Sequence, residues 1–241
     1  MSSSTDPSDA ASGPVRPIVF LHLPKTAGTT LKAIIEDVYT PGKVLNLRVA
    51  QGGVRRLFTM PPAERARFDV VAGHLDWRVT RLLPGARVIT VLRDPVDRFL
   101  SWFYYALRNE NAPLHAELNE LGGDVGRAVE SGRYAPQYNI MTEMLRDQAA
   151  AGPDAALESA KRNLASCAAF GLSERFTESV RLMERTLGWP ATEWEDRNVT
   201  ANRPRVEDLS DDARAALEAG CAPDRALYDY AASLFDERLA S

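Results

Sequence analysis

Residues 17–39, PIVFLHLPKTAGTTLKAIIEDVY, carry the strongest structural signal in this sequence. The first seven are mostly apolar and partly β-branched, which predicts a buried strand of a parallel sheet. From Thr26 onward the apolar residues recur at helical spacing, with Leu31, Ile34, Ile35 and Val38 on one side. The stretch therefore predicts a strand, a loop and a helix. Because a helix start exposes unpaired N–H groups and the positive end of the helix dipole, the loop is a candidate anion site.

The alternation of strand and helix patterns recurs later in the chain. FDVVAGH (68–74), ARVITVL (86–92) and CAAFGL (167–172) have the composition of further buried strands, and VDRFLSWFYYALRN (96–109) has helical spacing. Strands that alternate with helices predict an α/β fold with a central parallel sheet.

The polar segments set the expected domain limits. Residues 107–165 are mainly helical in pattern and more polar, which predicts a mostly helical cover over the site. Residues 1–16 are rich in Ser, Asp, Pro and Gly and predict a disordered tail. We therefore expect a single domain over residues 17–241.

Composition limits the classes of partner. The formal net charge of −4 over 241 residues gives no general attraction to nucleic acid or to an anionic bilayer. Cys167 and Cys221 are too few for a disulfide framework, and their spacing with the three histidines matches no zinc pattern. The sequence shows no signal-peptide pattern and no run of about 18 apolar residues. We expect a soluble, cytoplasmic protein, with neither a membrane nor nucleic acid as partner; the oligomeric state stays open.

The order of residues in the first loop distinguishes it from a nucleotide-binding P-loop. In the pattern G-x-x-x-x-G-K-[ST] the lysine follows the last glycine, whereas here Lys25 precedes Gly28 and Thr29 takes the lysine position. FDVVAGH also lacks the aspartate that a metal-dependent NTPase would place at its end. The loop therefore suits an anion that needs no metal. Its predicted contacts are Lys25, Thr26, Ala27, Gly28, Thr29 and Thr30.

A second motif, RDPVDRFLS, spans residues 93–101. It places Arg93 at the carboxyl end of a strand, Asp94 as an N-cap and Pro95 at the first helical position. Ser101 lies two helical turns after Asp94 and returns to the face near Arg93, so one phosphate could contact both side chains. The alternative is an ordinary capped helix, with Ser101 on the surface and Arg98 paired to Asp94.

These two motifs resemble those of the PAPS-dependent sulfotransferases. HLPKTAGTTL is similar to the phosphosulfate-binding loop of the branch that includes uronyl 2-O-sulfotransferases and bacterial carbohydrate-type sulfotransferases, and the match extends weakly over residues 17–235. The resemblance implies a P-loop nucleotide-kinase-like three-layer fold. It also implies PAPS (3′-phosphoadenosine 5′-phosphosulfate) as sulfuryl donor with no metal required, and a 3′-phosphate held by Arg93 and Ser101. Thr200 and Arg203 resemble late family residues that close over the nucleotide.

His74 is the expected general base. It follows a predicted strand, so it should lie at the same sheet edge as Lys25, and its GH dipeptide is similar to the family segment that carries the catalytic histidine. Lys25 would stabilise charge on the leaving oxygen. His22 and Asp76 are alternative bases, and a buried strand-end histidine without catalytic role is the alternative for His74.

The charge of the cover suggests the kind of acceptor. From residue 105 to 160 the only basic residues are arginines, and Asp and Glu outnumber them. A polyanionic glycan needs a cationic track, so we expect a small hydroxylated acceptor, neutral or weakly charged. Gln137 and Asn139 are candidate acceptor contacts, with helix capping as the alternative. A nucleotide kinase or NTPase on the same architecture, and a catalytically silent PAP-binding protein, remain alternative functions.

Overall fold

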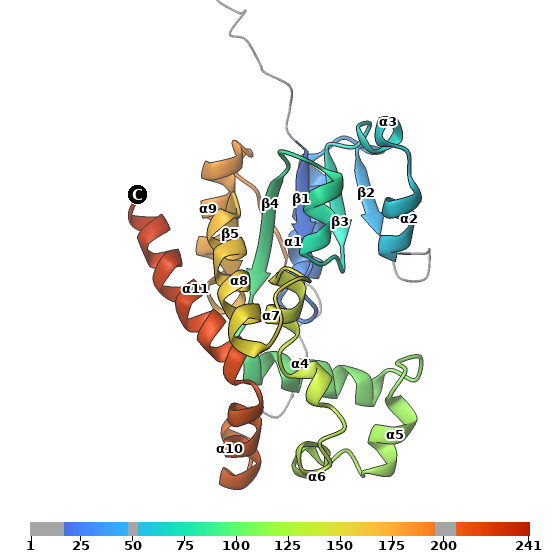
Figure 1. The fold of residues 1–241 in the computed structure, drawn as a ribbon, viewed down its shortest axis with the longest axis vertical. Helices are drawn as coiled ribbons and strands as arrows, with labels where there is room; N and C mark the ends of the chain where they lie inside the picture. The colour runs from blue at the N-terminus through green and yellow to red at the C-terminus, as the bar shows by residue number, and fades with distance from the viewer. Residues whose placement is uncertain (1–16, 48–52, 196–205) are drawn as a thin grey trace, which may run out of the picture.

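The computed structural model describes residues 17–47, 53–195 and 206–241. Its centre is a sheet of five parallel strands in the order β2-β3-β1-β4-β5. In chain order the strands are β1 (Ile18–Leu21), β2 (Val44–Leu47), β3 (Val70–Gly73), β4 (Arg87–Leu92) and β5 (Ala169–Leu172). Since all of them run the same way, their carboxyl ends meet at one edge, the lower one in Figure 1. This confirms the predicted α/β fold with a central parallel sheet; the predicted tail, 1–16, lies outside the described residues.

Strand β2 was not predicted. It is a four-residue edge strand in which buried Leu45 and Leu47 alternate with the half-buried Val44 and Asn46. Asn46 interrupts the apolar run, and so short an alternation gives little sequence signal.

Helices cover both faces of the sheet and its carboxyl edge (Figure 1). The described helices are α1 (Gly28–Val38), α2 (Gly53–Thr59), α3 (Pro62–Arg65), η2 (Trp77–Leu82), α4 (Pro95–Arg108), α5 (His115–Glu120), α6 (Val125–Glu130), η3 (Ala135–Gln137), α7 (Ile140–Leu145), α8 (Pro153–Ser166), η4 (Ser173–Arg175), α9 (Phe176–Leu187), η5 (Val206–Asp208), α10 (Asp211–Gly220) and α11 (Ala222–Ala240).

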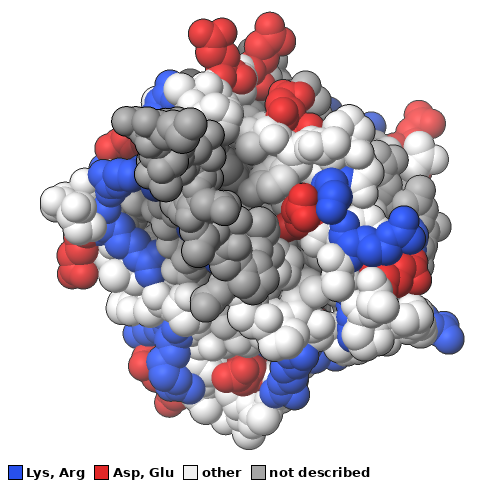
Figure 2. All heavy atoms as spheres, turned by 90° about the horizontal axis from the view of Figure 1, so that it is seen from above, with Lys and Arg blue, Asp and Glu red and all other residues white. Residues whose placement is uncertain are grey.

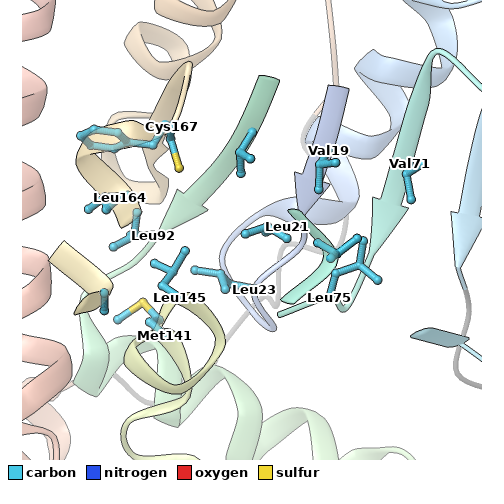
Figure 3. Close-up of a cluster of buried hydrophobic side chains, with 14 of the residues drawn as sticks. Val19, Leu21, Leu23, Val71, Leu75, Leu92, Met141, Leu145, Leu164 and Cys167 are labelled. Atoms are coloured by element: carbon cyan, nitrogen blue, oxygen red, sulfur yellow. The ribbon is translucent and has the colours of Figure 1, made fainter. Parts of the chain in front are cut away.

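Alternate residues of the strands face opposite sides and build two cores. Ile18 and Phe20 of β1 belong to the core that packs on α1 and α9. Val19 and Leu21 belong to the core that packs on α7, α8 and α11. This period of two is expected for strands buried on both faces, and it produces the predicted three layers. Figure 3 shows the second core, in which Met141 and Leu145 of α7 approach Leu21 and Leu23.

A third apolar cluster lies beyond the carboxyl edge. It joins α4, α5, α6 and α10 through buried residues that include Phe99, Phe103, Leu118 and Leu217. Of these helices, α5 and α6 belong to the segment predicted as a helical cover (107–165), whereas α4 comes almost entirely before it and α10 after it; all four lie below the sheet in Figure 1. The opposite face, at the amino ends of the strands, carries Lys and Arg interspersed with Asp and Glu (Figure 2). Within the described ranges, no helix is both long and apolar enough to cross a membrane.

Candidate functional site

Buried side chains hold the loop between β1 and α1 in its conformation. Leu23 is fully buried, and the buried Thr26 hydroxyl donates to the Leu23 carbonyl at 2.8 Å. Lys25 and Ala27 adopt left-handed backbone conformations, with φ of 68° and 63°. Such conformations cost about 1 kcal/mol or more for residues with a side chain, so the packing of Leu23 and Thr26 must hold them. The loop is therefore a preformed turn.

The start of α1 is open to an anion. Ala27, its N-cap residue, offers no side-chain hydrogen bond to the first-turn N–H groups, which helix geometry leaves pointing out of the helix end. Gly28 is required here because a Cβ atom at that position would lie 2.0 Å from His22 Cδ2. Thr29 is exposed at this end, whereas Thr30 is buried.

The second motif meets this loop directly. Arg93 follows β4, and its Nη1 donates to the Lys25 carbonyl at 3.0 Å. Asp94 caps α4 by accepting from the Asp97 N–H at 2.9 Å, and Pro95 occupies the first helical position, as predicted. The structure thus brings together the two motifs that were predicted to hold the phosphosulfate and the 3′-phosphate of one donor, through a bond from Arg93 to the backbone of Lys25.

One face of α4 runs alongside both cations. Arg93 Nε donates to Asp97 Oδ2 at 2.7 Å, and its Nη2 reaches the same oxygen. Ser101 lies one turn beyond Asp97, and Tyr105 one turn further. The Lys25 ammonium lies 4.2 Å from the centroid of the Tyr105 ring. Ser101 is therefore placed between the side chains that hold Arg93 and Lys25.

Arg98 does not pair with Asp94, so that part of the capped-helix alternative is wrong. Asp94 pairs instead with Arg225 of α11, at 2.5 Å between Oδ2 and Nη2. Arg98 is fully buried and donates to the Gln137 carbonyl. Because the cover lies over this side of α4, the arginine points into the protein.

His74 follows β3 and is exposed at the carboxyl edge of the sheet. Its Nδ1 lies 2.7 Å from the His22 carbonyl oxygen. A carbonyl can only accept, so this contact requires the proton on Nδ1 and leaves Nε2 with a lone pair. The backbone of the loop thereby sets the tautomer that a general base needs.

The two alternative bases are less suited to accept a proton near neutral pH. Burial and the neighbouring charges of His74, Lys32 and Lys25 lower the pKa of His22 to about 3. For Asp76, burial raises the pKa, but the hydrogen bonds and charge of Arg78 outweigh it and hold that pKa below its ordinary value. Both groups are weak proton acceptors at pH 7.

The amide of Asn139 is engaged between two helices. Its Nδ2 donates to the Gly220 carbonyl at 2.8 Å, and its Oδ1 accepts from the Asp224 N–H at 3.1 Å. Asp224 in return accepts from the N–H groups of Met141 and Thr142 at the start of α7. These bonds favour the capping alternative for Asn139. Gln137 is half-buried in η3, and Thr200 and Arg203 lie outside the described residues.

A cavity of about 290 Å³ adjoins the site along α1. It is lined by Thr30, Ala33, Ile34, Asp37, Glu193, Trp194 and Glu195. Across the described part of the chain, no group of three or more His, Cys, Asp or Glu side chains could hold a metal ion.

Sequence reasoning missed Asp97 and Tyr105. Their spacing of four from Ser101 was the available signal, because residues four apart share a helix face. Nothing local, however, indicated that Lys25 would lie over that face.

Comparisons with known proteins agree with the resemblance. The galactose-3-O-sulfotransferase family model matches residues 1–241. Heparan-sulfate 6-O-sulfotransferase 3 of Mus musculus is 28% identical over 284 residues, which cover 92% of this chain and 58% of the relative. Heparan-sulfate 6-O-sulfotransferase 1 of Homo sapiens is 27% identical over 287 residues, covering 92% and 66%. The chain thus spans about three fifths to two thirds of the length of these relatives.

A solved structure is similar in fold. It is that of mouse sulfotransferase SULT7A1 complexed with PAP, with a TM-score of 0.51 and 13% identity, covering 91% of this chain and 89% of that chain. At this identity the similarity concerns the fold alone, and it confirms the predicted architecture.

Proposed function

The chain belongs to the galactose-3-O-sulfotransferase family, and on that premise we propose that it transfers the sulfuryl group of PAPS to a hydroxyl group. The observation that carries the proposal is the contact of Arg93 with the Lys25 carbonyl, which joins the two predicted anion-binding motifs at the carboxyl edge of the sheet. Ligands of open parallel sheets bind at this edge.

The residues present fit the donor. The start of α1 offers backbone N–H groups, Gly28 lets that helix start pack against the His22 ring, and Lys25 adds a full charge. We assign the phosphosulfate to this loop and the 3′-phosphate to Arg93 and Ser101. The cavity beside Thr30, with Trp194 in its lining, supports placing the adenosine along α1. Thr200 and Arg203 stay proposed contacts from the resemblance.

When bound, PAPS supplies the sulfuryl group and a phosphate leaving group. In this proposal His74 accepts the proton of the attacking hydroxyl at Nε2, because its Nδ1 proton is committed to the His22 carbonyl. Lys25 stabilises the negative charge that grows on the leaving oxygen. The arrangement needs no metal ion from the protein.

For the acceptor we propose a small hydroxylated molecule that is neutral or weakly charged. The relatives above are named for heparan sulfate, a polymer, but three arginines of the cover already pair with carboxylates: Arg127 with Asp124, Arg133 with Glu117 and Arg146 with Glu143. An internally paired arginine adds little attraction for a polyanion. Gln137 stays a proposed acceptor contact.

A nucleotide screen tests the donor assignment. PAP without magnesium should raise the melting temperature, whereas a kinase or NTPase would respond to ATP with magnesium. The position of Thr29, where a P-loop has lysine, argues against the kinase. Absence of PAP binding would refute the proposal.

Turnover tests the reaction and the acceptor. The protein should be assayed with PAPS against a heparan-type polymer and a panel of neutral alcohols, glycosides and phenols. We expect sulfation within the small-molecule panel. Efficient sulfation of the polymer alone would refute the acceptor assignment, and PAP binding without turnover on any acceptor would indicate a catalytically silent protein.

A further inference from the structure

The α4 face formed by Asp97, Ser101 and Tyr105 contacts both cations assigned to the donor. Asp97 accepts from two nitrogens of Arg93, and the Tyr105 ring lies under the Lys25 ammonium. Neither Asp97 nor Tyr105 has a role in the function proposed above. Both cations are thus engaged by the protein at the place where that function requires them to meet phosphate and sulfate oxygens.

The ion pair of Arg93 with Asp97 is strong enough to affect the binding of an anion by Arg93. A guanidinium has five N–H donors, and the Nε and Nη2 side of Arg93 faces one carboxylate oxygen while Nη1 is used by the Lys25 carbonyl. The side chains of Arg93 and Asp97 are only 19% and 25% exposed, so solvent screens the pair incompletely. A phosphate that binds Arg93 must share or displace that carboxylate.

The Tyr105 contact is held in place by a second residue. Asn109, the C-cap residue of α4, donates from Nδ2 to the Tyr105 hydroxyl oxygen at 2.7 Å. The ring is 46% exposed, one of two large hydrophobic side chains with high exposure among the described residues. Its exposure is explained if the ring serves as a platform for Lys25, since an ammonium over an aromatic face is attracted by the ring quadrupole.

We propose that Asp97 and Tyr105 are positioning residues that compete with the nucleotide for Arg93 and Lys25. The competition lowers the affinity for donor and product alike, and it promotes product release because α4 offers each cation a replacement partner as the anion leaves. This inference rests on the proposed function, because it requires Arg93 and Lys25 to bind PAPS and PAP.

Removal of either competitor should tighten PAP binding. Asp97→Asn keeps the shape of the side chain and removes its charge, and Tyr105→Leu keeps apolar bulk and removes the ring. We expect a fall in the PAP dissociation constant of about two- to fivefold for Tyr105→Leu, the range of an exposed cation–π contact, and at least as much for Asp97→Asn. The change should lie mainly in a slower PAP dissociation rate.

Matched control variants distinguish the loss of competition for the cations from general effects of a substitution on PAP affinity. Tyr105→Phe keeps the ring and removes only the hydroxyl that accepts from Asn109, so it should bind PAP close to the wild-type value and lack the gain in affinity expected for Tyr105→Leu. Glu120→Gln removes an exposed charge at the end of α5 and should leave PAP affinity unchanged. Damage to the fold would weaken binding, so a gain in affinity cannot come from a misfolded variant.

Calorimetry and stopped-flow measurements on the full chain decide between the outcomes. Tighter PAP binding in Asp97→Asn and Tyr105→Leu, with both controls at the wild-type value, supports the inference. Weaker or unchanged binding in those two variants, in a wild type that binds PAP, overturns it and assigns Asp97 and Tyr105 to orienting the cations for the nucleotide or to no role. Failure of the wild type to bind PAP overturns the proposed function itself.

Discussion

The largely but not fully buried imidazole of His22 should make the stability of this protein depend on pH. Its ring stacks on Phe20 with centroids 5.3 Å apart, abuts Gly28 and lies 4.4 Å from the His74 ring. Burial is the largest cause that lowers the pKa of His22 to about 3, from an ordinary 6.5. The folded protein therefore keeps this ring neutral at a pH where the unfolded chain protonates it.

The sign and size follow from proton linkage. Below pH 6.5 the unfolded state binds the extra proton, so stability falls as the pH falls. For a folded pKa of about 3, the free energy of unfolding should drop by about 1.4 kcal/mol between pH 7.5 and 5.5 through His22 alone. Residual contact of the ring with water makes this figure an upper value.

Urea unfolding of the wild type, His22→Gln and His22→Asn at both pH values measures this contribution. Each substitution has its own cost, but neither new side chain titrates, so that cost is the same at pH 7.5 and 5.5. Groups that titrate elsewhere contribute equally to all three proteins. The wild type should lose about 1 kcal/mol more than either variant over this range, and a difference below about 0.3 kcal/mol would refute the reasoning.

Three further predictions concern the site and its supports. Lys25→Ala and Arg93→Ala should each weaken PAP binding by ~1.5–3 kcal/mol, the contribution of a charge-assisted hydrogen bond; unchanged affinity in both, by calorimetry, would contradict the donor site. His74→Ala should lower turnover by roughly 10²–10⁴-fold and leave PAP affinity near wild type, and full activity would transfer the role of base elsewhere. Burial raises the pKa of Asp224 from 3.8 to about 6, so the folded state retains a proton that the unfolded state releases. Its contribution should reduce stability by about 2 kcal/mol as the pH rises from 4 to 7; the stability difference between wild type and Asp224→Asn should show this slope, and parallel pH curves would argue against it.

Much of the fold could be predicted because its signals are local. Short, mostly apolar runs such as 68–74 and 86–92 are typical of buried strands or buried helices, and their length and their flanking turns favour strands. The structure has β3 and β4 inside these ranges. Helix α5 lies in the segment predicted as mainly helical, but it gives little signal of its own, because the stretch NENAPLHAELNE has few apolar residues and a proline just before the helix begins.

The position of the site could be predicted for the same reason, since parallel strands bring their carboxyl ends together. Lys25, Arg93 and His74 each follow a strand and lie at the same edge. The partners of these residues could not be predicted. The Arg93 bond to the Lys25 carbonyl joins positions 68 apart, and the Asn139 bond to Asp224 joins positions 85 apart. Such contacts depend on how helices dock, which no local pattern encodes.

Asp224 of α11 caps the start of α7, and this long-range contact has a consequence for biosynthesis. Thr142 is translated 82 residues before Asp224, the residue whose carboxylate accepts its N–H. While the intervening chain is made, α7 lacks the Asp224 carboxylate that caps its start. Arg98 lacks the same carboxylate, whose negative charge favours the charged form of the buried guanidinium. Such long-range closure is slow compared with helix formation. On the ribosome the sheet can therefore pair its strands well before the cover becomes fixed, and the site reaches its working shape only after α11 has emerged.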